Sequence, residues 1–295
     1  MSRVAIKAVE DRAQLGIVMM LVAYLSFSFI DTSVKWLVIA GLPALQLAFV
    51  RYAGHFLISI GTIARGGIGP ERFATEHPWT VLLRGALLVS STAFNFISLN
   101  YLPLTVTSAI MFSAPIIVCA LSMPLLGERV GPWRWLAIVV GFAGVLVVIR
   151  PGGAAFHWAM LLSIYNAFAL ALYSILTRKL AGVVATETLQ LYGSALGTIT
   201  LLPFAWAVWQ NPVGAVDWFI MFALGLWGWG GHELLTRAHA FAPASTLMPY
   251  TYSFMIYLTI SSYLIFDHVP DQATVLGALI IIASGLLIWA RERRA

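Results

Sequence analysis

The chain has 295 residues, of which 60% are hydrophobic and only 10% are charged, whereas a soluble domain carries about 25% charged residues. This composition excludes a soluble enzyme or binding module. The net charge of +5 is small and lies in the loops of one face, so it indicates membrane topology rather than a nucleic-acid-binding surface. The single cysteine, Cys119, excludes an intramolecular disulfide.

Apolar stretches of about 20 residues, long enough to cross a bilayer, fill the chain. Turn-forming Gly, Pro and Asn residues separate them, as at Gly41-Leu42-Pro43 and Asn211-Pro212. We therefore predict an all-α integral membrane protein with ten transmembrane helices and no extramembrane domain. In chain order the predicted spans are 15–40, 43–64, 79–100, 103–126, 133–150, 156–179, 187–209, 216–238, 244–266 and 272–290.

The fourth and ninth spans reveal a repeat with an offset of 140 residues. The segment from Tyr101 matches the segment from Phe241, and Pro103 falls on Pro243. The repeat unit, residues 1–150 and then 151–295, holds five spans. Because five is odd, the second unit enters the membrane from the opposite side, which is the usual construction of a secondary transporter.

Basic residues predict the orientation in the membrane. If the N-terminus is cytoplasmic, 13 of the 17 Lys and Arg residues lie at the cytoplasmic face. This bias places both termini in the cytoplasm. The polar first twelve residues contain no A-x-A-like cleavage site, so we expect no removed signal peptide.

The arrangement resembles the drug/metabolite transporter superfamily, in the branch built from two EamA-type five-helix repeats. The resemblance covers nearly the whole chain, although each motif is short. It departs from the pattern where Met255 replaces a second-half counterpart of Pro115, which predicts unequal kinks in the two halves. The matching motifs are Phe49-Val50-Arg51, Leu99-Asn100-Tyr101-Leu102-Pro103 and Ser113-Ala114-Pro115 running to Leu126-Gly127-Glu128-Arg129.

The resemblance implies a multi-pass carrier of the bacterial inner membrane that works by alternating access, without enzymatic activity and without a cofactor. The aromatic-rich core is most similar to the bacterial aromatic amino acid exporters. No metal-binding, Walker or metalloprotease motif is present in the sequence.

Three charged residues in the first hairpin are candidates for gating or for a structural ion pair. Asp31 and Arg51 lie at similar depths on consecutive spans, so they could pair directly, either as a clamp or as a carboxylate-binding gate. Lys35, one turn from Asp31, could compete for it or extend toward the surface.

The eighth span places two tryptophans and two ionisable residues, Trp227, Trp229, His232 and Glu233, near mid-membrane among four glycines. One interpretation is a cavity with an aromatic wall and an ionisable floor. The other is that Glu233 pairs with Arg237 along its own helix while the glycines pack.

Further polar and aromatic residues near mid-span could bind a substrate, although aromatic stripes more often serve packing. A buried amide or hydroxyl needs a partner, which the substrate could supply. These residues are Tyr24, Ser28, Asn95, Tyr101, Tyr165, Asn166 and Tyr250.

We therefore predict a secondary transporter that exports small metabolites, above all aromatic or neutral amino acids and aromatic cationic drugs. The alternatives are a carrier of the same fold for S-adenosylmethionine or nucleotide-linked solutes, a passive channel, or a membrane enzyme. The expected partners are the small-molecule substrate and membrane lipid. The carrier would be a monomer, or a homodimer formed through the fifth and tenth spans.

Overall fold

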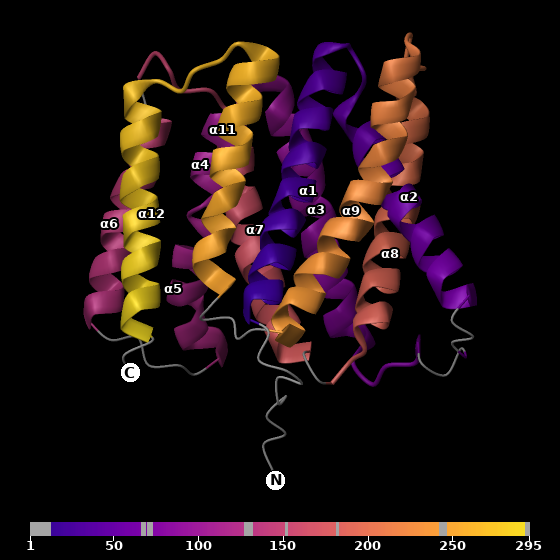
Figure 1. Ribbon diagram of the computed structural model, residues 1–295, viewed down its shortest axis with the longest axis horizontal. Helices are drawn as coiled ribbons and strands as arrows, with labels where there is room; N and C mark the ends of the chain where they lie inside the picture. The colour runs from indigo at the N-terminus through magenta and orange to yellow at the C-terminus, as the bar shows by residue number, and fades with distance from the viewer. Residues whose placement is uncertain are drawn as a thin grey trace.

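A computed structural model describes residues 13–65, 69, 73–126, 132–150, 153–180, 183–241 and 247–292, and these residues are largely helical. The long helices stand side by side, and α1 begins at the end of the bundle where α12 finishes (Figure 1). The first repeat comprises α1 (Ala13–Ile39), α2 (Ala44–Arg65), α3 (Pro78–Tyr101), α4 (Leu104–Met111), α5 (Ala114–Leu126) and α6 (Pro132–Ile149). The second comprises α7 (Ala159–Leu180), α8 (Thr186–Ala207), α9 (Ala215–Phe241), the 3₁₀ helix η2 (Met248–Tyr252), α11 (Ser253–Phe266) and α12 (Gln272–Glu292).

The predicted spans correspond to these helices in order, and two of the spans are interrupted. The fourth consists of α4 and α5, separated at Phe112 and Ser113. Pro115 follows this break within the first turn of α5, where its missing N–H leaves no hydrogen bond unmade. The ninth begins as η2, which contains Pro249, and continues as α11. The two halves therefore differ at matching positions, with two α-helices in the first and a 3₁₀ helix followed by an α-helix in the second, while the predicted inequality of the kinks stays a prediction.

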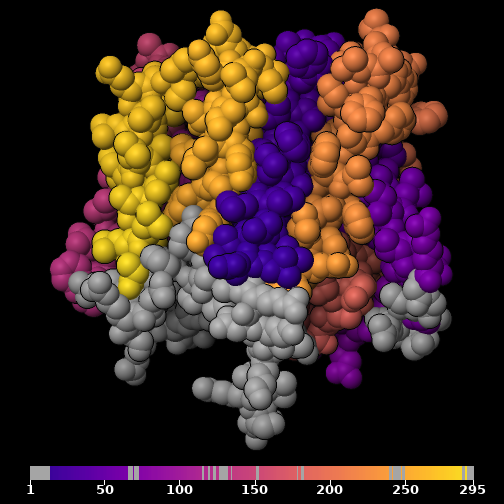
Figure 2. Space-filling model, viewed as in Figure 1, coloured from indigo at the N-terminus to yellow at the C-terminus, as the bar shows by residue number. Residues whose placement is uncertain are grey.

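Judged by length and hydropathy alone, four helices among the described residues could cross a membrane: 14–39, 44–65, 78–101 and 159–177. Three shorter apolar helical stretches cover 104–118, which includes the break between α4 and α5, 135–149 and 272–287. All of these pack in the same bundle as the remaining helices. Figure 2 shows α1, α9, α11 and α12 forming one continuous face. Large apolar side chains are exposed on the outer surfaces, among them Leu57, Val139, Phe142, Phe219 and Leu279.

Glycines allow two pairs of helices to approach closely. On α2 and α9, a Cβ added to Gly225 would lie 2.6 Å from the Gly54 Cα. On α6 and α12, a Cβ added to Gly144 would lie 2.9 Å from the Gly277 carbonyl oxygen. The small residues of the fifth and tenth spans thus pack against each other within one chain. The predicted homodimer through these spans stays a prediction, and it would have to use other faces of the two helices.

A charged link joins the two repeats at the end of the bundle opposite the start of α1. Arg150, directly after α6, forms an ion pair with Asp271, directly before α12. Asp271 also caps α12, because its Oδ1 accepts the Thr274 backbone N–H at 2.8 Å. Hydrogen bonds from Thr274 and the ion pair with Arg150 lower the pKa of Asp271 to about 2.

Candidate functional site

A chain of buried polar side chains connects α1, α3 and α7 in the interior of the bundle. Asn95 Nδ2 donates to Asp31 Oδ1 at 3.1 Å, and Asn166 Nδ2 donates to Asn95 Oδ1 at 3.2 Å. Ser91, one turn from Asn95 on α3, donates to Asn166 Oδ1. All four side chains are buried, with at most 8% of their surface exposed. This Asp31–Asn95–Asn166 network brings together three of the predicted site residues from three spans.

Two hydroxyl groups next to this network are buried and have no hydrogen-bond partner among the described residues. They belong to Thr32, adjacent to Asp31, and to Ser163, one turn from Asn166. A buried hydroxyl without a partner costs free energy, so each is a point at which water or a bound molecule could be accommodated. Nothing in the sequence distinguishes these residues, because isolated Ser and Thr residues are common in membrane helices.

Aromatic rings lie along the same face of α1. Tyr24, Ser28 and Asp31 occupy successive turns of that helix, at spacings of four and three residues. The Tyr24 ring lies 5.7 Å from the Phe27 ring and 6.0 Å from the Phe254 ring, centroid to centroid. Beyond it, Phe112 at the α4–α5 break lies 6.4 Å from Phe254. Ser28 donates to the Leu25 carbonyl within its own helix.

Arg51 belongs to a second network, which adjoins the first at Ser91 and Thr92 on α3, and the predicted direct Asp31–Arg51 ion pair does not form. Its guanidinium donates to Thr92 Oγ1 at 3.2 Å and lies 3.4 Å from His232 Nε2. The reason is packing, because α2 lies mainly against α8 and α9 rather than against α1. Lys35 does not pair with Asp31 either, since its ammonium donates to two backbone carbonyls at the end of α3.

Glu233 pairs with Arg237 one turn along its own helix, at 2.8 Å, as the simpler interpretation of the eighth span predicts. It also accepts a 3.5 Å hydrogen bond from Gln190, which in turn contacts His55. The ring of His232 lies 5.9 Å from that of His55. Glu233 thus contacts α8, whereas His232 lies between His55 of α2 and Phe27 of α1, whose ring centroid is 5.1 Å away and which is one turn before Asp31.

The other predicted site residues are distributed around the bundle. Trp227 packs on Phe29 at 5.1 Å, and Phe29 is 39% exposed on the outer surface. Trp229 is only partly buried. The Tyr165 hydroxyl donates to Ser90 at 2.9 Å, next to the Asn166 contact. Trp227 of the predicted aromatic wall therefore packs against a residue on the outer side of α1.

Two predicted site tyrosines, Tyr101 and Tyr250, lie toward opposite ends of the helix bundle. Tyr101 is half-exposed at the end of α3, where it stacks on His157 at 5.3 Å and contacts Trp158. Tyr250 in η2 packs against a small apolar cluster that includes Met20 and Leu247. No group of three or more His, Cys, Asp or Glu side chains in the described part of the chain could hold a metal ion.

The family model of the EamA-like transporter family matches residues 14–150 and again 157–290, which together are almost the whole chain. The chain belongs to the EamA-like transporter family. It is thus a membrane transporter built from two inverted five-helix repeats. A family relative at 28% identity, a riboflavin transporter of Rhizobium johnstonii, aligns over 100% of this chain and 97% of its own length.

Two other relatives in this family have different names. An S-adenosylmethionine uptake transporter of Rickettsia bellii is 27% identical over 95% of each chain. A pseudopaline exporter of Pseudomonas aeruginosa is 24% identical over 94% of this chain and 96% of its own. A solved crystal structure superposes with a TM-score of 0.64 at 20% identity, covering 97% of this chain and 99% of the other, and this likeness concerns the fold alone. None of these relatives is named as an aromatic amino acid exporter.

Proposed function

We propose that this EamA-family protein carries a heteroaromatic metabolite with several hydrogen-bonding groups, of the class to which S-adenosylmethionine and riboflavin belong, by alternating access. The observation that carries the proposal is the Asp31–Asn95–Asn166 network with buried, unpartnered hydroxyls beside it. Carboxamides present both donors and acceptors, so they can match the edge of a heterocycle. The rings of Tyr24, Phe254 and Phe112 supply surfaces on which such a ring can pack.

The charge of the network favours cationic or neutral cargo over phosphorylated cargo. Asp31 is the one ionisable side chain in it, and a carboxylate can hold an ammonium or sulfonium group. Phosphate groups require several converging Lys or Arg residues. Arg51, the nearest such residue on α2, is instead engaged by Thr92 and His232. Nucleotide-linked solutes therefore fit this site poorly.

The names of relatives support the same class of cargo, since they include riboflavin and S-adenosylmethionine transporters. The amino acid cargo predicted from the resemblance remains an outcome to be tested. We also propose that both termini are cytoplasmic in a bacterial inner membrane, and that residues 1–150 and 151–295 form the two structural units.

Counterflow in proteoliposomes tests the proposal directly. Vesicles are loaded with excess unlabelled S-adenosylmethionine, riboflavin or tryptophan, and entry of the labelled compound is followed. Transient accumulation of labelled S-adenosylmethionine or riboflavin above equilibrium is expected for a carrier of this class. Accumulation of tryptophan alone would instead support an aromatic amino acid exporter, and flux without counterflow would indicate a channel.

The variant Asp31→Asn separates a cationic cargo from a neutral one. Removing a buried charge partner is expected to lower S-adenosylmethionine counterflow at least ~10-fold, because a charged hydrogen bond contributes about 1.5–3 kcal/mol. Riboflavin counterflow should change less than about twofold, since an asparagine can still accept the Asn95 hydrogen bond. The control Asp267→Asn changes an exposed carboxylate in a backbone conformation that asparagine tolerates. An unchanged rate for both cargoes would remove Asp31 from the site.

A further inference from the structure

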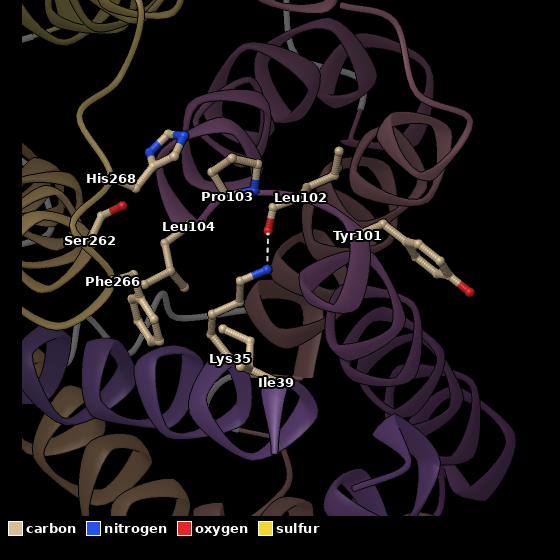
Figure 3. Close-up of a pocket in the computed structure, with 9 residues that line it drawn as sticks. All are labelled: Lys35, Ile39, Tyr101, Leu102, Pro103, Leu104, Ser262, Phe266 and His268. Atoms are coloured by element: carbon tan, nitrogen blue, oxygen red, sulfur yellow. Dashed lines mark hydrogen bonds between the residues drawn. The ribbon is translucent and has the colours of Figure 1, made fainter. Parts of the chain in front are cut away.

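A cavity of about 230 Å³ opens at the end of the bundle where α1, α3 and α11 finish and α4 begins. Figure 3 shows Lys35 and Leu102 on one side of this cavity and Ser262, Phe266 and His268 on the other. The walls therefore come from both repeats. The cavity lies beyond the Asp31–Asn95–Asn166 network, because Lys35 is one turn past Asp31 on the same helix.

The positive charge of Lys35 is held in place without a carboxylate partner. Its Nζ donates to the Leu99 carbonyl at 2.7 Å and to the Leu102 carbonyl at 3.0 Å (Figure 3 shows the second bond). Among the described residues, no Asp or Glu forms an ion pair with it. An ammonium group has three N–H donors, so one remains available on the side of the cavity. The two carbonyls fix the position of the charge and leave it able to bind an anion.

The turn that ends α11 places an imidazole across the cavity from Lys35. Asp267 adopts a left-handed conformation with φ of 50°, and the His268 backbone N–H donates to the Ser262 carbonyl at 3.0 Å. This pattern is a Schellman-type helix end, which folds the chain back over the last turn. As a result His268 and Ser262 line the same cavity, and His268 Nδ1 is buried with no partner within the part of the chain that the structure describes.

We propose that this cavity is a binding site for the carboxylate of a small organic acid, separate from the mid-membrane network. Lys35 supplies the charge, Ser262 and His268 supply hydrogen bonds, and the Phe266 ring packs against the apolar part of the ligand. A lysine at this end of the bundle goes against the predicted distribution of basic residues, most of which lie at the opposite end. The carboxylate belongs either to the transported molecule or to a separate anion.

The test measures binding rather than transport, so it is independent of the proposed cargo. Purified protein in lipid nanodiscs is titrated by calorimetry with benzoate and with benzamide, which has the same shape but no charge. We expect benzoate to bind at least ~10-fold more tightly than benzamide. The variant Lys35→Met should abolish this preference. The matched control Lys179→Met, an exposed lysine near the end of α7, should keep it.

A second variant keeps the test decisive if Lys35→Met does not fold, because Lys35 also caps α3. The variant His268→Ala leaves the α3 carbonyls untouched and should weaken benzoate at least ~3-fold. Equal affinities for benzoate and benzamide, no detectable benzoate binding, or benzoate binding that neither variant changes would each overturn the proposal.

Competition identifies the source of the carboxylate. Displacement of benzoate by S-adenosylmethionine, but not by its decarboxylated form, would support the proposal with the cargo as the source. Displacement by neither compound, with benzoate binding still dependent on Lys35, would support it with a separate anion as the source.

Discussion

The charged side chains of the first two spans and Glu233 of the eighth each have a different local partner. Asp31 accepts from an asparagine, Lys35 donates to backbone carbonyls, and Arg51 donates to a threonine. Glu233 has its own arginine one turn away on α9. Charges within a membrane are costly unless satisfied, and here short-range partners on neighbouring helices or on the same helix satisfy them. A charge that is already paired within its own helix is a weak candidate for binding cargo.

The variant Glu233→Gln tests this distinction. Glutamine keeps the shape and can still hydrogen-bond to Arg237 and Gln190, so we expect counterflow of the transported compound to remain within about twofold of the wild type. Ion pairs of this i, i+4 kind contribute only about 0.3–0.5 kcal/mol on exposed helices. A loss of more than about tenfold, with normal expression, would return Glu233 to the substrate site. Its thermal unfolding measured in detergent provides the folding control.

At the scale of helices, the positions of glycine determine which spans touch. Gly225 on α9 faces Gly54 on α2 so closely that the two backbones are in contact. Gly230, only five residues further along α9, has no atom within 4 Å of an added Cβ. The same helix therefore contains a glycine required by packing and one that is not.

This contrast provides a matched pair of variants. Gly225→Ala should destabilise the protein by ~1–3 kcal/mol, because the added methyl group forces α2 and α9 apart. Gly230→Ala should be neutral or slightly stabilising, because alanine favours the helix over glycine. Thermal unfolding of both variants in the same detergent measures the difference. Equal stability of the two would mean that α2 and α9 do not approach as described.

At the scale of the whole molecule, two repeats of one pattern produce helices with unequal roles. Asn95 from the first repeat and Asn166 from the second meet at the interior network, while Arg150 and Asp271 join the repeats at one end. The Lys35–His268 cavity opens at that same end. If both termini are cytoplasmic, this end faces away from the cytoplasm. The orientation therefore determines the side of the membrane to which the cavity opens.

Cysteine labelling tests the orientation. In a Cys119→Ser background, Val213→Cys places a thiol in the fully exposed connection between α8 and α9, and Glu76→Cys places one in the exposed segment before α3. We expect a membrane-impermeant maleimide to modify the Val213→Cys variant in intact cells. The Glu76→Cys variant should react only after permeabilisation. The reverse pattern would place the termini outside.

The sequence by itself was sufficient for the all-helical membrane fold, the ten spans and the repeat, because hydropathy and turn residues are local properties of the chain. The local pair of Glu233 with Arg237 was one of two interpretations that the sequence left open, and the structure has it, because a spacing of four residues needs only one helix. Tertiary structure decided which helices are neighbours. The sequence predicts similar membrane depths for Asp31 and Arg51. However, α1 packs on α9 and α3, whereas α2 packs on α8 and α9. The two charges therefore belong to different hydrogen-bond networks. The aromatic rings beside Tyr24 come from Phe27 and Phe254, whereas Trp227 packs on Phe29, for the same reason: depth is encoded locally, but rotation and packing partner are not.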